Sequence, residues 1–284
     1  MTTRHQQFLD SPEETVRGWI EDFVANSPQN RLVHVDGRPI FAKPLVGFAD
    51  GDDPMFQDYK RIIGEFHMTP REVMQASAPG ADVEHVSVIC YVLPVNDETR
   101  ASNCRETRHP SLEWAHTRNC GEPFNDAVRR HVVEKLREAG HAAVAPVVSD
   151  LFTVRRDSPV GIASTWSERH VLHVAGLGTF GLSDGLITPV GKAMRCGSIV
   201  TDARLKPTPR PYTTHTEYCP FHRDGSCGLC MARCPAGAIT EHGHDKETCR
   251  NHIRSMHEEM GESGITIGGC GLCQAGVPCE AGIP

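Results

Sequence analysis

Apolar and polar positions along the chain follow patterns that predict helices and strands packed in layers. Residues 11–26 place Val16, Ile20 and Val24 at helical spacing behind a proline and two acidic residues, so we predict an opening helix. Residues 85–93 (HVSVICYVL) are almost continuously apolar and rich in β-branched side chains, which is typical of a strand covered on both faces. The two patterns together indicate a sheet with helices against it.

The same reasoning predicts further elements up to the middle of the chain. A capping-box pattern predicts a helix over residues 69–76, and an amphipathic stripe predicts another over residues 122–139. Residues 142–148 favour a second buried strand, and a second capping box predicts a helix over residues 165–175. The polar stretch 94–120 is expected to be a long loop that forms a pocket wall. This order indicates an α/β layer.

Length and charge limit the function classes. A chain of 284 residues has room for an α/β core, expected over residues 1–210, and a smaller module, expected over residues 211–284. The formal charge of −7 gives no basic field, which argues against DNA as a partner. No apolar run approaches the ~18 residues of a membrane span, and no secretory pattern opens the chain. We therefore expect a cytoplasmic protein with no membrane partner.

Cysteines gather in the last quarter of the chain, which holds eight of the twelve. They are Cys219, Cys227, Cys230, Cys234, Cys249, Cys270, Cys273 and Cys279. Their x2 and x3 spacings and the Cys234-Pro235 pair match the bacterial ferredoxin run, in which the cysteine before proline ligates the other cluster. The spacing thus predicts two 4Fe–4S clusters in a bacterial-ferredoxin-like module.

The crossover rule divides the eight thiols into two sets of four. Cys219, Cys227 and Cys230 form the first thiol set with one cysteine of the distal group, most simply Cys279, and the second thiol set is then Cys234, Cys249, Cys270 and Cys273. Zinc sites and a disulfide framework are the alternatives. The first 218 residues hold only four cysteines, which disfavours a disulfide framework, and zinc does not explain the Cys-Pro ending.

A glycine-rich segment directly follows the helix predicted over residues 165–175. Its spacing suggests a dinucleotide fingerprint, but that motif follows a strand and opens a helix, whereas this one closes a helix. A glycine-rich backbone can still approach a bulky ligand closely. The cofactor-binding residues that we predict here and just downstream are Gly176, Leu177, Gly178, Thr179, Phe180, Gly181, Thr188 and Cys196. For Cys196 a buried structural cysteine is the alternative.

Proton donors for a reduced substrate are sought near this segment. His170 and His173 lie three residues apart on the predicted helix and point in similar directions. An imidazole titrates near neutral pH and suits proton delivery, although a structural histidine is the alternative for each. Arg195 and Asp157 complete the candidate catalytic residues.

Several short motifs together carry a family resemblance over residues 140–284. They are Glu168-Arg169, the segment 175–181, Leu186-Ile187-Thr188-Pro189-x-Gly191, Arg195, Thr201-Asp202 and the cysteine module. In this combination the chain resembles the superfamily of corrinoid iron–sulfur reductases that contains epoxyqueuosine reductases and reductive dehalogenases. The chain departs from the epoxyqueuosine reductase pattern at Ile162, where that pattern has an acidic residue, and Asp157 lies five positions earlier.

The resemblance implies a nitroreductase-like α/β core that binds cobalamin beside the glycine-rich segment. It further implies electrons from an external ferredoxin or flavodoxin, passed through the clusters to cobalt and then to a small organic or nucleoside substrate. A flavin, or substrate alone, in that pocket is an alternative. A second hypothesis is a non-catalytic electron-transfer protein that docks a partner enzyme. The 218 residues before the module exceed what a carrier needs and favour an enzyme.

Overall fold

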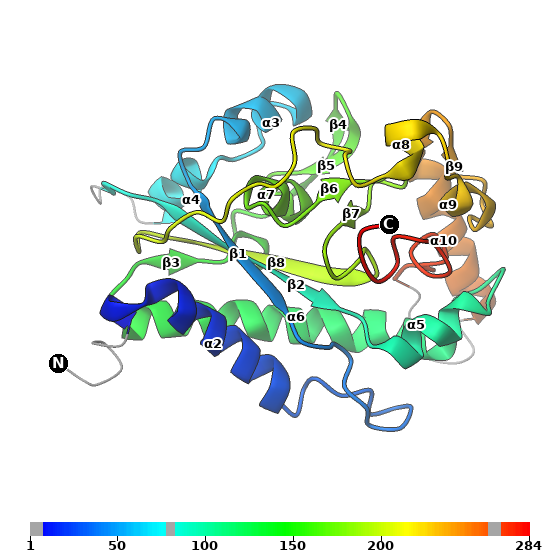
Figure 1. Ribbon diagram of the computed structural model, residues 1–284, viewed down its shortest axis with the longest axis horizontal. Coiled ribbons are helices and arrows are strands. Elements are labelled where there is room, and N and C mark those ends of the chain that lie inside the picture. The colour runs from blue at the N-terminus through cyan, green and yellow to red at the C-terminus, as the bar shows by residue number, and fades with distance from the viewer. Residues whose placement is uncertain (1–7, 78–82, 261–267) are drawn as a thin grey trace.

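A four-stranded antiparallel sheet forms the centre of the computed structural model, which describes residues 8–77, 83–260 and 268–284. Its strands lie in the order β1, β2, β8 and β3 (Figure 1). Their bounds are Leu45–Asp50 for β1, Ser87–Pro94 for β2, Met194–Thr201 for β8 and Ala143–Val144 for β3. The predicted α/β class is confirmed, while a nitroreductase-like core stays a prediction.

Strand β2 is the central strand, as its sequence predicts. All eight of its residues are buried, and it pairs with β1 on one side and β8 on the other. Ile89 and Tyr91 face one apolar core, whereas Val88 and Cys90 face a second. A continuous apolar run is therefore needed here because both faces of the strand exclude water.

Helices α2 (Pro12–Asn26) and α6 (Leu112–Glu138) cover one face of the sheet (Figure 1). They pack through stacked aromatic rings, of which Phe23 and Phe124 have centroids 5.9 Å apart. The opening helix predicted over residues 11–26 is confirmed. Burial of such aromatic side chains contributes strongly to core stability.

The long loop predicted over residues 94–120 is wrong. Helix α5 (Asp97–Cys104) and the start of α6 occupy this stretch. Two caps start these helices: Asn96 Oδ1 accepts a hydrogen bond from the Thr99 N–H at 2.8 Å, and Ser111 Oγ accepts one from the Trp114 N–H at 3.2 Å. The polar composition concealed α5 and the first turns of α6. The helix predicted over residues 122–139 is confirmed as the larger part of α6, although Pro123 lies within this helix instead of near its start.

The other face of the sheet is covered by α3 (Met55–Ile63), α4 (Pro70–Ser77) and α7 (Glu168–Val174). The capping box of α4 is confirmed, since the Thr69 N–H donates to Glu72 Oε2 at 2.8 Å and the Glu72 N–H donates to Thr69 Oγ1 at 3.3 Å. The second predicted capping box is wrong. Thr165 Oγ1 donates to the Leu151 carbonyl at 2.7 Å, and α7 starts three residues later.

Short elements make up the rest of the chain, and those near the C-terminus gather at one end of the sheet (Figure 1). Their bounds are Pro146–Val148 for η1, Val154–Ser158 for β4, Gly161–Ser164 for β5, Thr179–Phe180 for β6, Leu186–Ile187 for β7, Pro220–Asp224 for α8, Leu229–Ala232 for α9, Ile239–Thr240 for β9, Gly243–His244 for β10 and Lys246–Met260 for α10.

The C-terminal segment 268–284 returns to the core. The Lys192 N–H donates to the Cys279 carbonyl at 2.9 Å, and the Ala193 N–H donates to the Glu280 carbonyl at 3.2 Å. The last cysteine is thus fixed next to the start of β8. The division at residue 210 and the ferredoxin-like module stay predictions. None of the helices in the described part of the chain has the length and apolar character to cross a lipid bilayer.

Gly197 in β8 provides a test of the sheet packing. A Cβ at this position would lie 2.3 Å from Tyr91 Oη, so we expect G197A to lower the free energy of unfolding by ~1–3 kcal/mol through overpacking. In α2, a Cβ at Gly18 would meet nothing within 4 Å, so G18A should stabilise by ~0.4–1 kcal/mol. Urea unfolding measures both changes. Equal free energies of unfolding for G197A and G18A would contradict the close packing of Gly197 against Tyr91.

Candidate active site

A cavity of about 440 Å³, here called the central cavity, is lined by residues of α6, α7 and β8 and of the loops beside them. Its charged lining residues are Glu122, Arg129, Glu168, Arg169, Lys192 and Arg195. A larger groove of about 1150 Å³ is lined by α2 and by His131 and Lys135 of α6, but no cysteine lines it. The redox chemistry predicted from the sequence therefore points to the central cavity.

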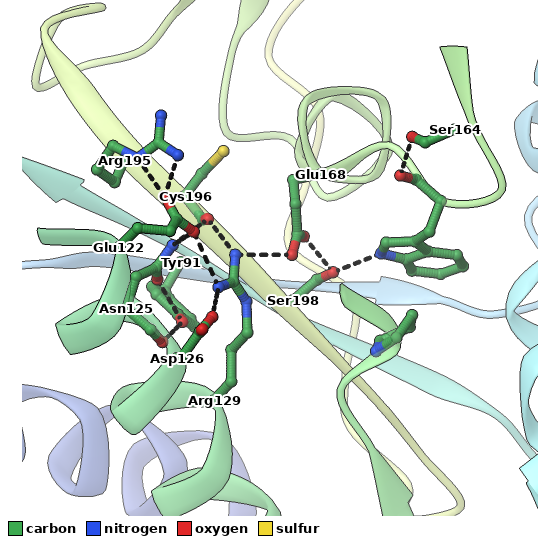
Figure 2. A network of polar contacts seen from close by, with 12 residues as sticks. Tyr91, Glu122, Asn125, Asp126, Arg129, Ser164, Glu168, Arg195, Cys196 and Ser198 are labelled. Carbon is green, nitrogen blue, oxygen red and sulfur yellow. Dashed lines mark hydrogen bonds and ion pairs between the residues drawn. The ribbon is translucent and has the colours of Figure 1, made fainter. Parts of the chain in front are cut away.

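Arg129 organises the wall of this cavity (Figure 2). The residue is only 1% exposed, and its guanidinium lies 2.7 Å from Asp126, 3.2 Å from Glu122 and 3.2 Å from Glu168. It also donates to the Cys196 carbonyl at 3.0 Å. One buried cation thus joins α6 to both α7 and β8.

Glu168 is the carboxyl group in this network that holds a proton most readily. Burial raises the pKa of Glu168, and Arg129 and Ser198 offset only part of that effect. Ser198 Oγ donates to Glu168 and accepts a hydrogen bond from Trp166 Nε1 at 2.9 Å. The carboxyl group is therefore held in one position and stays protonated to a higher pH than an exposed glutamate does.

The pKa of Glu122 is shifted in the opposite direction to that of Glu168. Burial acts to raise its pKa, but Arg195 and Arg129 outweigh burial and lower the pKa to about 2. Arg195 Nε donates to Glu122 Oε2 at 2.8 Å, which places this predicted catalytic residue at the cavity. Glu122 therefore stays ionised to a lower pH than Glu168 does.

The two predicted histidines lie outside the central cavity. His173 is buried, its Nδ1 lies 2.8 Å from the Gly178 carbonyl, and its ring stacks on Tyr212 at 4.8 Å between centroids. His170 Nδ1 lies 2.7 Å from Ser167 Oγ, and its side chain lines an adjoining cavity of about 380 Å³. Burial lowers the pKa of both, that of His170 to about 3, so both rings are neutral near neutral pH.

Asp157, the remaining predicted catalytic residue, is exposed on β4. It forms an ion pair at 2.9 Å with Arg155, and it lines neither the central nor the adjoining cavity. The structure therefore brings only Arg195, of the four predicted catalytic residues, to the central cavity.

The glycine-rich segment lets backbone segments touch one another. Gly176 has φ +77°, and a Cβ there would lie 2.5 Å from the Pro209 carbonyl oxygen. A Cβ at Gly178 would lie 2.3 Å from the Ile187 carbonyl oxygen. No residue of 176–181 lines the central cavity, although Gly181 lines a small cavity at the first thiol set.

The other predicted cofactor-binding residues occupy varied places. Leu177 is buried in the second core, and Thr179 Oγ1 accepts from the Tyr218 N–H at 2.9 Å. Phe180 packs against His170 and His173, and Thr188 Oγ1 donates to the Gly191 carbonyl at 2.7 Å. Cys196 lines the central cavity, and burial raises the pKa of its thiol to about 12.

In each predicted thiol set, neighbouring thiols influence one another. Burial raises the pKa of Cys230, and the other three thiols of the first thiol set raise it further. Burial also raises the pKa of Cys273 to about 12, with contributions from the other three thiols of the second thiol set. In both cases the thiols that raise the pKa, in addition to burial, belong to the same set as the cysteine whose pKa is raised.

The two thiol sets have the chemistry that iron–sulfur clusters require. All twelve cysteines are free thiols, and among the described residues no three or more His, Cys, Asp or Glu side chains converge on a single metal ion. In a cubane cluster each thiolate binds a different iron atom, so its ligands stand farther apart than those of one ion. The four thiols of the first thiol set line one small cavity, and all eight thiols are buried or half-buried.

Two residues connect the thiol sets to the central cavity. Lys192 lines both the central cavity and the small cavity between the thiols of the first thiol set. Gln274, which follows Cys273 of the second thiol set, also lines the central cavity. The central cavity is therefore bordered by a residue that also lines the cavity of the first thiol set and by the residue that follows Cys273 of the second thiol set.

Sequence reasoning missed Glu122, Arg129 and Lys192 as site residues. Glu122 and Arg129 lie seven residues apart and so share one helix face, which is the signal that could have found them. The charges of this helix were instead expected to face solvent. No sequence pattern marks Lys192 as a site residue, because its position depends on the packing of segment 268–284 against the start of β8.

Comparisons with known proteins give matches among solved structures only. No model of a known family and no curated protein matches the sequence. A selenomethionine-labelled epoxyqueuosine reductase is 17% identical with a TM-score of 0.41, and the match covers 83% of this chain and 61% of that chain. Epoxyqueuosine reductase from Bacillus subtilis is 17% identical with a TM-score of 0.37, covering 84% and 62%.

A third similar structure is a catabolic reductive dehalogenase. It is 14% identical with a TM-score of 0.43, and the match covers 74% of this chain and 27% of that chain. These proteins are of the two kinds that the sequence motifs resemble. The chain spans about three fifths of the length of the epoxyqueuosine reductase chains that it matches.

Glu122 allows a test of the charge network through acid stability. Its lowered pKa stabilises the fold fully above pH 4.5, and this contribution is lost as the pH falls toward about 2. We expect E122Q to be less stable than the wild type near neutral pH and to lose less stability over this pH range. Urea unfolding at several pH values measures the difference. E134Q, on the exposed side of α6, is the control, and identical pH profiles for E122Q and the wild type would refute the pairing.

Proposed function

We propose that this chain is an iron–sulfur oxidoreductase that passes electrons through two 4Fe–4S clusters to an acceptor in the central cavity. The observation that supports this proposal most directly is the common wall: Lys192 borders both the first thiol set and a cavity with a buried, charged lining. Clusters at the two thiol sets would supply one-electron chemistry at low potential. An external ferredoxin or flavodoxin is the electron donor that we propose, on the strength of the family resemblance of the sequence motifs.

The acceptor that we propose is a small organic molecule or a modified nucleoside. A volume of about 440 Å³ lies within the ~300–1000 Å³ of typical small-ligand pockets. Adding electrons to an organic acceptor in a site of low dielectric builds up negative charge unless a proton follows. Glu168 lines the cavity and holds a proton readily, so we propose that it donates this proton. Arg129 and Ser198 would then stabilise the ionised carboxylate.

A cobalamin-type cofactor is a second candidate for the immediate electron acceptor. A corrinoid exceeds a drug-sized ligand and needs more room than the central cavity alone offers. The central and adjoining cavities share the lining residues Phe152, Ser164, Ser167 and Arg169, so together they give a longer groove. These residues would hold the corrinoid, which when bound supplies a strongly reducing cobalt centre. Retention of hydroxocobalamin or of a flavin after desalting, read by absorbance, distinguishes these cofactors from direct reduction of the substrate.

The alternative of a non-catalytic electron carrier is less well supported. A carrier needs only clusters and a docking surface. The buried Arg129, with three carboxyl groups around it at a cavity wall, is costly to bury and gives a carrier no benefit. A site that binds and protonates an acceptor has a use for such a network.

Replacing one thiol in each set tests the two clusters. We expect anaerobically purified wild type to contain about eight iron atoms per chain, and C279A and C249A each to lose up to about four, because each removes a ligand of a different cluster. Iron and sulfide analysis with electron paramagnetic resonance (EPR) measures the loss. C120A, outside both thiol sets, should keep the full amount. Zinc in place of iron, or unchanged iron in both variants, would refute the proposal.

Replacing Glu168 tests the proton donor. With dithionite as reductant and para-nitrobenzoate as a probe acceptor, we expect E168Q to slow reduction by ~10²–10⁴-fold, because Gln keeps the hydrogen bonds but has no proton to give. Wild-type activity should fall as the pH rises through the raised pKa of Glu168, and E168Q should lack this decline.

The control for this prediction is E134Q, which should retain wild-type rates. Iron content and EPR signals must match those of the wild type in each variant, so that only the proton step differs. Wild-type rates and the same pH profile in E168Q would exclude Glu168 as the donor.

A further inference from the structure

Lys192 has an unusual environment for a lysine. Its side chain is buried, with the residue only 3% exposed. In the described part of the chain its Nζ donates to Ser183 Oγ at 3.0 Å and forms no ion pair with a carboxylate. Burying an ammonium group without a negative partner is costly. The position therefore indicates that a negative charge lies beside Lys192 in the working protein.

The neighbours of Lys192 show where that charge belongs. Lys192 lines a small cavity together with all four thiols of the first thiol set, Cys219, Cys227, Cys230 and Cys279. Lys192 thus lies beside the first thiol set.

Backbone contacts fix Lys192 in this place. Its N–H donates to the Cys279 carbonyl at 2.9 Å. The preceding Gly191 has φ +82°, and a Cβ there would lie 2.0 Å from the Glu280 carbonyl oxygen, so only glycine allows this close approach. The backbone of Lys192 is therefore held against the C-terminal segment, while the hydrogen bond to Ser183 Oγ holds the ammonium group.

We propose that Lys192 is a positioning residue whose fixed positive charge raises the reduction potential of the clusters, most of all the cluster at the first thiol set. This inference rests on the proposed function. Reduction adds one negative charge to a cluster, and a nearby buried cation stabilises the reduced state more than the oxidised state. The electron is then held beside the central cavity, where Lys192 forms part of the wall.

Lys246 offers a matched control. It also borders a cavity, but only the adjoining one, and its Nζ donates to the carbonyls of Val160 and Ile162 at 3.3 Å each. Lys246 lines neither the central cavity nor the small cavity at the first thiol set. Removing this charge should leave the cluster at the first thiol set unaffected.

The test is a redox titration monitored by EPR on K192M, K192R and K246M, after iron analysis of each protein. We expect K192M to have a lower midpoint potential than the wild type for at least one cluster. K192R keeps the charge and should stay close to the wild type, as should K246M. If K192M binds less iron, K192Q, which keeps hydrogen bonding but not the charge, is titrated in its place.

Two results would overturn the inference. One is an unchanged set of midpoint potentials in the neutral variants at full iron content. The other is an equal fall in K246M, which would show that any lost cation has the same effect. A wild-type protein without iron would instead refute the proposed function itself, so the two failures are distinguishable.

Discussion

The ion pairing of the buried Arg129 is the interaction on which the rest of the site depends. Its guanidinium contacts Glu122 and Asp126 on its own helix, Glu168 on α7 and the Cys196 carbonyl on β8. A charge that is 1% exposed is tolerable only if these partners stay in place. The arrangement therefore fixes α6, α7 and β8 around the central cavity.

The second constraint is the return of the C-terminal segment to the core. Backbone hydrogen bonds from Lys192 and Ala193 to residues 279 and 280 place the last cysteine of the first thiol set against the start of β8. The same contacts bury the Lys192 ammonium group between the thiols and the cavity. The first thiol set and the central cavity are thereby brought together by a few short contacts, although the residues involved are far apart in sequence.

The parts of the fold that local chemistry determines could be predicted from the sequence. Strand β2 follows from its apolar run, and α4 follows from the reciprocal bonds of Thr69 and Glu72. Helix α5 was missed because its residues are polar and its start depends on one cap, Asn96. Thr165 was misread because its hydroxyl binds Leu151 instead of capping α7, a tertiary contact with no local signal.

Sequence patterns predict site residues only where the spacing between residues itself indicates a function, as it does for the cysteines. The eight cysteines could be divided into sets because cluster ligation follows a spacing rule. Glu168 entered only as part of a family motif, since its raised pKa arises from burial against other elements. Asp157 was selected from a motif-like sequence, yet it lies on the exposed strand β4 because nothing in that sequence encodes the direction of the hairpin.

The central claim, that the eight thiols hold two cubane clusters beside the cavity, is tested most directly by crystals grown without oxygen. An anomalous-difference map at the iron edge should show two separate groups of iron, one within each thiol set, with Lys192 between the first group and the cavity. Single zinc ions at these cysteines, or sulfur–sulfur bonds between them, would contradict the account.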